Sequence, residues 1–146
     1  LHDRLKMTGA ALAVKTVDGL IDNKISGQPQ KGLIDEEKIN ATHAPKIFTE
    51  TCKIDWSGTA EKIYNLIRGL SPFPGAFTQL QGKLFKIYRA EKKITAHHTP
   101  VGDFDTDHKT FLRFACADGY IYAKDIQAEG KKRMLVEEFL RGFREV

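Results

Sequence analysis

Two prolines separated by one residue divide this chain more sharply than any other feature of its sequence. Pro72 and Pro74 fall in the run Leu70-Ser71-Pro72-Phe73-Pro74-Gly75. Proline cannot continue a helix, and it pushes the residue before it into an extended conformation. A helix that reaches Leu70 must therefore stop there, and the backbone should lead from Gly75 into a strand.

The segment before the prolines has the pattern of an amphipathic helix. Its apolar residues recur three or four positions apart, at Ala60, Ile63, Tyr64, Ile67 and Leu70. Ser57 is the expected N-cap, and Trp56 is placed to pack back onto the first turn. Gly69 is expected to end the helix in a left-handed conformation.

The segment after the prolines has the pattern of short strands. The expected strands lie at 76–80, 84–90, 110–116 and 120–127. Gln81-Gly82 and Ala117-Asp118-Gly119 are the expected hairpin turns. Residues 95–109 are rich in turn-forming residues, and 137–141 predict a short closing helix. These elements predict a mainly β (α+β) domain, a small antiparallel open barrel of the oligonucleotide-binding (OB) type with one packed helix. A flat sheet with a helix on one face is the alternative.

The first 45 residues look different from the rest. Apolar residues at helical spacing predict a helix over 1–22, and Gly27, Pro29, Gly32 and Pro45 mark 23–45 as a linker. The main domain is therefore expected over 46–146. The chain begins with Leu1, and we expect a fragment of a longer protein. Its sequence contains neither a signal-peptide pattern nor an apolar run of about 20 residues that could span a membrane.

Positive charge is concentrated in the second part of the chain. The net charge is +4, and residues 1–45 contribute nothing to it. Two clusters carry the excess: Lys83, Lys86, Arg89, Lys92 and Lys93; and Lys131, Lys132 and Arg133. Such clusters favour a polyanionic partner, although a solvated strand face would have the same composition. On a regular strand Lys86, Tyr88 and Lys92 would share one face, with Tyr88 free to stack on a base.

Motifs for catalysis and metal binding are largely missing from the sequence. It contains no GxSxG, P-loop, GxGxxG or HExxH motif, so no catalytic residue is predicted. The run from Asp103 to Asp107 begins like a calcium loop but lacks its glycine and its closing glutamate. His97 and His98 would point to opposite faces of a strand, so no metal site is predicted. Cys52 and Cys116 are expected to be buried free thiols of a cytoplasmic protein.

The motifs of residues 46–142 together resemble the C-terminal domain of methionyl-tRNA formyltransferases. The matching segments are Ile54-Asp55-Trp56-Ser57, Ile67-Arg68-Gly69-Leu70-Ser71-Pro72, Pro74-Gly75-Ala76, Gly82-Lys83, Glu129-Gly130-Lys131-Lys132-Arg133-Met134 and Phe139-Leu140-Arg141-Gly142. Residues 1–22 resemble the last helix of that family's N-terminal catalytic domain, which makes 23–45 the interdomain linker.

The resemblance implies a function that this chain would share with a larger enzyme. The parent would transfer a formyl group from formyl-tetrahydrofolate to the methionyl amino group of initiator tRNA, in translation initiation. The family's catalytic residues and folate motif belong to the N-terminal domain, so this chain alone is expected to be inactive and to bind no cofactor. Its partners would be initiator methionyl-tRNA and that catalytic domain.

The resemblance assigns the tRNA-facing role to the basic residues of the two clusters as a group. It does not indicate which of them touch phosphate. A dimer formed through the exposed helix 1–22 would be an artefact of truncation. Two other functions fit the same residues. One is a scaffold domain of a sugar-nucleotide formyltransferase, and the other is a stand-alone OB-type module that binds nucleic acid.

Overall fold

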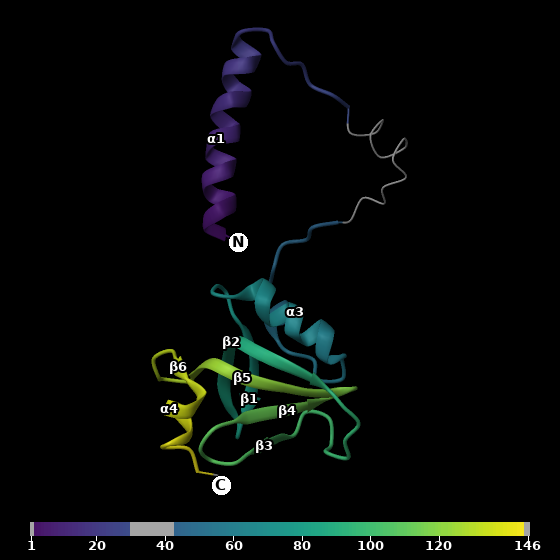
Figure 1. Cartoon of the computed structure of the whole chain (residues 1–146), viewed down its shortest axis with the longest axis vertical. Helices are drawn as coiled ribbons and strands as arrows, with labels where there is room; N and C mark the ends of the chain where they lie inside the picture. The colour runs from purple at the N-terminus through teal and green to yellow at the C-terminus, as the bar shows by residue number, and fades with distance from the viewer. Residues whose placement is uncertain (1, 30–42, 145–146) are drawn as a thin grey trace. The chain divides into compact units, whose positions relative to one another are not determined.

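The computed structural model describes residues 2–29 and 43–144, which belong to two compact units, 1–45 and 46–146. The first unit contains helix α1 (His2–Ile21), in agreement with the helix expected over 1–22 (Figure 1). Residues 30–42 of the expected linker lie outside the described part of the chain. Within the described ranges, no helix has the length and apolar character needed to cross a membrane.

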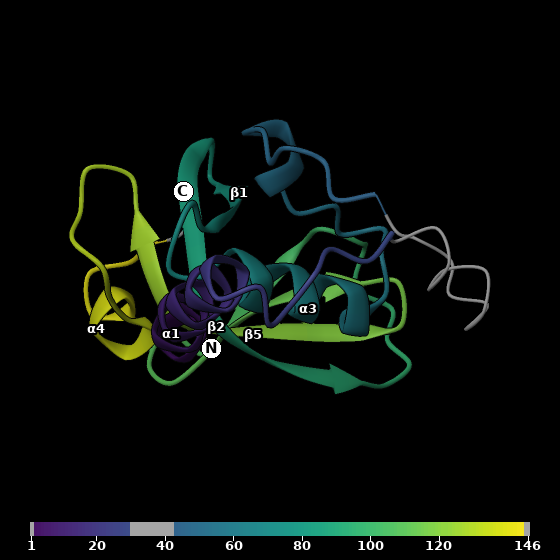
Figure 2. The ribbon, with the colours of Figure 1, turned by 90° about the horizontal axis from the view of Figure 1, so that it is seen from above.

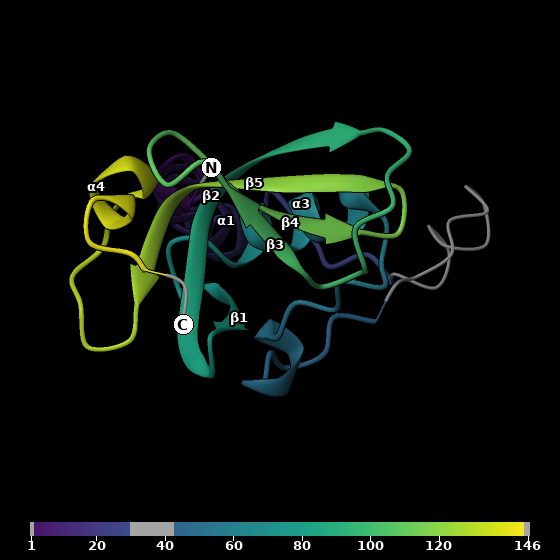
Figure 3. The same cartoon turned by 90° about the horizontal axis from the view of Figure 1, so that it is seen from below.

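The second unit is a curved antiparallel sheet with helices packed beside it. Its strands are β1 (Ala76–Leu80), β2 (Lys83–Ile94), β3 (Phe104–Thr106), β4 (Leu112–Cys116), β5 (Gly119–Ala128) and β6 (Met134–Leu135). They are ordered β1-β2-β5-β4-β3 (Figure 3). The short strand β6 pairs with β5. The long strands β2 and β5 form the centre of the sheet, as the expected mainly β fold requires.

Three helical segments accompany the sheet. A short 3-10 turn, η1 (Glu50–Cys52), precedes α3 (Ala60–Leu70), and α4 (Val136–Leu140) follows β6. Figure 2 shows α3 running along the sheet, where it contacts β2 and β5. Its buried residues Ala60, Ile63, Ile67 and Leu70 are those of the predicted apolar stripe. The α3 face therefore closes the core from one side.

The start of α3 differs from the prediction made for Ser57. The N-cap is Thr59, whose hydroxyl accepts a hydrogen bond from the Lys62 amide, while Ser57 donates to the carboxylate of Asp55. That contact lowers the pKa of Asp55. A second cap comes from the β4–β5 turn, where Asp118 accepts a 2.7 Å hydrogen bond from the Ala60 amide. The helix begins later than predicted because these two acceptors bind the amides of Ala60 and Lys62, in its first turn.

The residue predicted to cap the end of α3 was also wrong. Gly69 lies inside α3, and the extended residue Ser71 follows the helix as its C-cap. The left-handed glycine is Gly75, with φ of +86°, and its amide donates to the Leu70 carbonyl. A wide turn of residues 71–74 therefore connects α3 to β1, because the two prolines separate the helix end from the glycine.

Trp56 joins the two sides of the core. Its ring stacks on Phe114 with centroids 4.6 Å apart, and its indole N–H donates to Thr78. Trp56 thus packs against β4 and β1. The Ile54-Asp55-Trp56 segment holds the strands in place, which is a structural role.

Candidate nucleic-acid interface

The face that each basic residue of β2 occupies is set by a bulge in the middle of the strand. Phe85 and Ile87 are buried while Lys86 and Tyr88 are half-buried, which is the predicted alternation. The register with β5 then shifts on either side of Arg89. Ala90 is buried where a regular strand would bury Arg89, and residues 91–94 of β2 are all exposed.

The bulge places Lys92 on a different face from the one predicted. Instead of sharing a face with Lys86 and Tyr88, Lys92 forms an ion pair with Glu61 of α3. Its amino group also lies 5.0 Å from the centroid of the Tyr64 ring. The hydrogen bond from Lys92 lowers the pKa of the Glu61 carboxyl. Lys92 therefore connects α3 to the sheet.

Arg133 is also held by its neighbours. Its guanidinium makes two hydrogen bonds to Asp125, one of them 2.8 Å long, and lies 4.4 Å from the centroid of the Tyr88 ring. The contact with Asp125 raises the pKa of Arg133. Because the guanidinium covers one side of the Tyr88 ring and the phenol donates to Gln127, that side is closed to a stacking base.

Lys86 makes a third internal contact of this kind. Its ammonium donates a 3.0 Å hydrogen bond to the carbonyl oxygen of Pro74, in the turn before β1. The side chain is half-buried beside Gly75. Lys86 thus stabilises the wide turn, and its charge is only partly available to a ligand.

The other five predicted residues are exposed cations. They make no side-chain hydrogen bond or ion pair with any part of the chain that the structure describes. They are Lys83, Arg89, Lys93, Lys131 and Lys132. A free ammonium or guanidinium group can meet a phosphate without first breaking an internal contact.

These five cations do not form one continuous patch. Lys83 and Lys93 lie near opposite ends of β2, separated by a path of about 30 Å along the strand. Lys83 and Lys131, by contrast, line the same cavity although 48 residues separate them in sequence. Phe139 and Phe143 line this cavity too and were not predicted. Their spacing of four residues at the closing helix would have been the available signal.

Arg113, on β4, is a further cationic residue that no sequence pattern indicated. The Arg113 guanidinium donates to Asp105 and to the Tyr122 hydroxyl and lies 4.1 Å from the Tyr120 ring centroid. These contacts neutralise Arg113 and connect β3, β4 and β5. Arg113 therefore contributes to the sheet and little to the surface charge.

The loop 107–111, between β3 and β4, is organised by hydrogen bonds within the chain. Asp107 accepts hydrogen bonds from the Thr110 hydroxyl and from the amides of Lys109, Thr110 and Phe111, and these contacts lower its pKa.

Both ring nitrogens of His97 lie within 3.0 Å of carbonyl oxygens. No group of three or more metal-binding side chains occurs within residues 2–29 and 43–144.

The two cysteines are free and buried, as predicted. Burial raises the pKa of the Cys116 thiol, so this group is a poor nucleophile at neutral pH. In the part of the chain that the structure describes, both thiols are therefore core groups, whereas the five exposed cations have no internal partner.

Comparisons with known proteins identify the second unit. The family model described as formyl transferase, C-terminal domain, matches residues 46–144. Methionyl-tRNA formyltransferase of Phocaeicola vulgatus is 43% identical over 149 residues, which cover 99% of this chain and 46% of that protein. The Bacillus subtilis protein of the same name is 41% identical, over 97% of this chain and 43% of its own length.

A solved structure shares the fold at much lower identity. HypX from Aquifex aeolicus, as a four-site variant, superposes with a TM-score of 0.59 at 14% identity, covering 89% of this chain and 23% of HypX. This likeness concerns the fold alone. The chain spans about half the length of the curated relatives it matches. The match over residues 46–144 and the relatives' identities confirm the resemblance seen in the sequence, and the chain belongs to the formyl transferase C-terminal domain family.

Proposed function

We propose that this chain is the tRNA-binding C-terminal part of a methionyl-tRNA formyltransferase. The observation that carries the proposal is the match of nearly the whole chain to proteins of that name at 38–43% identity. The five exposed cations also support tRNA binding, because they suit a phosphate backbone. Both relatives quoted above carry the name methionyl-tRNA formyltransferase, which favours the tRNA enzyme over the sugar-nucleotide alternative.

The parent protein would perform the chemistry outside this chain. It would transfer the formyl group of formyl-tetrahydrofolate to the methionyl amino group of initiator tRNA, in the cytoplasm. Residues 1–22 would be the last helix of its catalytic domain, 23–45 the linker and 46–146 the tRNA-binding domain. The exposed apolar side chains of α1, such as Leu5, Leu12 and Leu20, suit a helix that packs on a larger partner.

Binding would depend on the basic residues in two ways. Lys83, Arg89, Lys93, Lys131 and Lys132 would approach phosphates and release counterions. Lys86, Lys92 and Arg133 would mainly hold the surface in shape, because each already has an internal partner. This division ranks the eight predicted residues by their availability to the ligand.

Salt dependence of tRNA binding tests the proposal. If about four phosphates are contacted, the logarithm of the affinity should fall with the logarithm of salt with a slope near −3. Lys132→Ala should reduce that slope by about 1, whereas Lys109→Ala, on the loop 107–111, should leave it unchanged.

Two outcomes would contradict the proposal. Failure to retain tRNA at low salt would exclude the tRNA-binding role. A much tighter affinity for single-stranded oligomers than for folded tRNA would favour a stand-alone OB-type module.

A further inference from the structure

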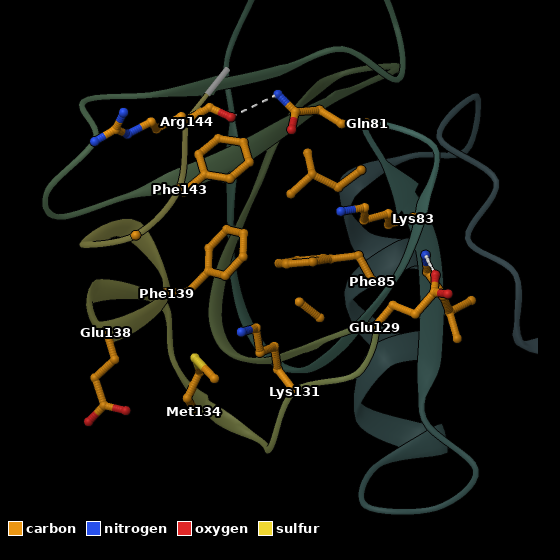
Figure 4. Close-up of a pocket in the computed structure, with 14 residues that line it drawn as sticks. Gln81, Lys83, Phe85, Glu129, Lys131, Met134, Glu138, Phe139, Phe143 and Arg144 are labelled. Carbon is orange, nitrogen blue, oxygen red and sulfur yellow. Dashed lines mark hydrogen bonds between the residues drawn. The ribbon is translucent and has the colours of Figure 1, made fainter. Parts of the chain in front are cut away.

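A cavity opens between the β1–β2 hairpin and the C-terminal helix α4. Its volume is about 520 Å³, within the range of about 300–1,000 Å³ that is usual for small-molecule sites. Its residues come from the β1–β2 hairpin, from the end of β5 through the following turn to β6, and from α4 with the segment after it (Figure 4). Three stretches of the chain, 80–85, 128–134 and 138–144, therefore converge on one hollow.

Aromatic rings form the inner wall of this cavity. Phe85 is buried in the core with 1% of its surface exposed, and the Phe139 ring meets it edge-on with centroids 5.3 Å apart. The Phe143 ring lies 5.0 Å from that of Phe139. Figure 4 shows the three rings facing the hollow. Because Phe139 and Phe143 are only half-buried, part of their surface remains open to a flat ligand.

The rim carries positive charge that has no internal partner. Lys83 and Lys131 both line the cavity, and neither ammonium group makes a hydrogen bond or ion pair within residues 2–29 and 43–144. One rim carboxylate, Glu129, already accepts a hydrogen bond from the Leu84 amide, and Figure 4 shows that Glu138 points away. The rim thus favours an anion next to the aromatic wall.

A nucleotide combines the two properties that this cavity selects. Its base is flat and stacks on aromatic rings, and its phosphate is attracted by lysine ammonium groups. A base inside a helix cannot enter, because its faces are covered by its neighbours, whereas an unpaired base can be turned outwards. The size of the cavity suits one such nucleotide.

We propose that this cavity receives the base of one unpaired nucleotide of the bound tRNA, with its phosphate held between Lys83 and Lys131. The inference rests on the proposed tRNA binding and adds a specific subsite to it. Contacts elsewhere on the surface would follow the phosphate backbone. This subsite would require an unpaired position in the RNA.

Methionine methyl groups provide a direct test in the full chain. The sequence contains two methionines, Met134 in the cavity and Met7 on α1 in the other unit. With methyl-¹³C-labelled methionine, titration with AMP at millimolar concentrations should shift the Met134 signal in a saturable way and leave Met7 unmoved. Adenosine and inorganic phosphate, tested separately, should each bind more weakly than AMP.

Substitutions at the rim and the wall separate the parts of the site. Lys83→Ala and Lys131→Ala should each weaken AMP binding several-fold, whereas Lys62→Ala, on the exposed side of α3, should not. Phe143→Ala should weaken it about tenfold, since stacking on a base depends on the ring. The lysine variants keep the test valid if loss of Phe143 disturbs the fold.

The outcomes distinguish this inference from the proposed function. If the Met134 signal does not respond to AMP while tRNA is still retained at low salt, the subsite is excluded and the tRNA-binding role stands. An equal response to phosphate alone would also exclude the subsite, because it would show ion binding only. If AMP binds but tRNA does not, the tRNA-binding role fails and the subsite cannot serve it.

Discussion

Among the glycines that the structure describes, Gly119 has the least room for a side chain. A methyl group on its Cα would lie 2.1 Å from the Lys93 carbonyl oxygen, which is part of the β2 backbone. Gly119→Ala should therefore push the ends of β2 and β5 apart and lower the free energy of unfolding by about 2 kcal/mol or more. Urea unfolding followed by circular dichroism would measure this loss.

Gly69 provides the matched control for that substitution. It lies inside α3, and an added methyl group would meet nothing within 4 Å. Gly69→Ala should stabilise the protein by up to about 1 kcal/mol, because alanine favours the helix. A destabilised Gly69→Ala variant, or an unaffected Gly119→Ala variant, would contradict these packing arguments.

Asp107 should make stability depend on acid pH. The Thr110 hydroxyl and three backbone amides hold its pKa below the ordinary value of 3.8. A carboxyl whose pKa is lowered on folding stabilises the protein above its unfolded pKa and loses that effect as pH falls. The difference in stability between the unmodified chain and Asp107→Ala should thus be constant at neutral pH and shrink below about pH 4.

Urea midpoints measured across this pH range would check the Asp107 prediction. Asp103→Ala, just before β3, is the control, because the Asp103 side chain makes no hydrogen bond to a residue that the structure describes. It should follow the unmodified chain at every pH. A difference for Asp107→Ala that does not change with pH would contradict the assigned role of the carboxylate.

Errors made from the sequence at the residue scale have a common cause. The prediction that Ser57 caps the helix was wrong because Asp118, which lies 58 residues from Ala60, supplies the acceptor for the first helical amide. The prediction that Gly69 ends the helix was wrong because the left-handed glycine is Gly75, after the prolines. Local patterns predict where a helix can begin or end, whereas the partner that fixes its end can come from a distant strand.

At the scale of the elements, alternation along β2 was predictable only as far as its bulge. The sequence 84–88 gives the buried and exposed faces correctly. Beyond it, the face of each residue depends on the pairing of Arg89 with Asp125, which the sequence of β2 alone does not contain. The prediction that Lys86 and Lys92 share one face of the strand was wrong for this reason.

The turn between β5 and β6 allows a direct comparison of two neighbouring basic residues. Arg133→Ala removes the contacts with Asp125 and Tyr88, so it should lower the free energy of unfolding by about 1 kcal/mol. Lys132→Ala should leave stability within about 0.5 kcal/mol, because its side chain is exposed, and should weaken tRNA binding alone.

Thermal unfolding and tRNA retention, measured on both of these variants, would check the comparison. An Arg133→Ala variant that is as stable as the unmodified chain would contradict a structural role for this residue. Equal losses of stability in the two variants would show that the turn, rather than the guanidinium, is sensitive to change.

At the scale of the whole molecule, the mainly β fold and the family were predictable, and the arrangement of the basic residues was not. Hairpin signals and the motifs around Trp56 and the prolines are local, so they are visible in one sequence. The meeting of Lys83 with Lys131 at a cavity depends on the pairing of β2 with β5, which no local pattern contains.

Removal of residues 1–45 provides a final prediction. The buried core belongs to the unit 46–146, and the family match begins at residue 46. The shortened chain should therefore unfold cooperatively with the same midpoint as the full chain and should bind tRNA with the same salt dependence. Sedimentation should also show less self-association, because the exposed apolar side chains of α1 are gone. A lower midpoint would mean that the first unit stabilises the second, and unchanged self-association would place the dimer contact within residues 46–146.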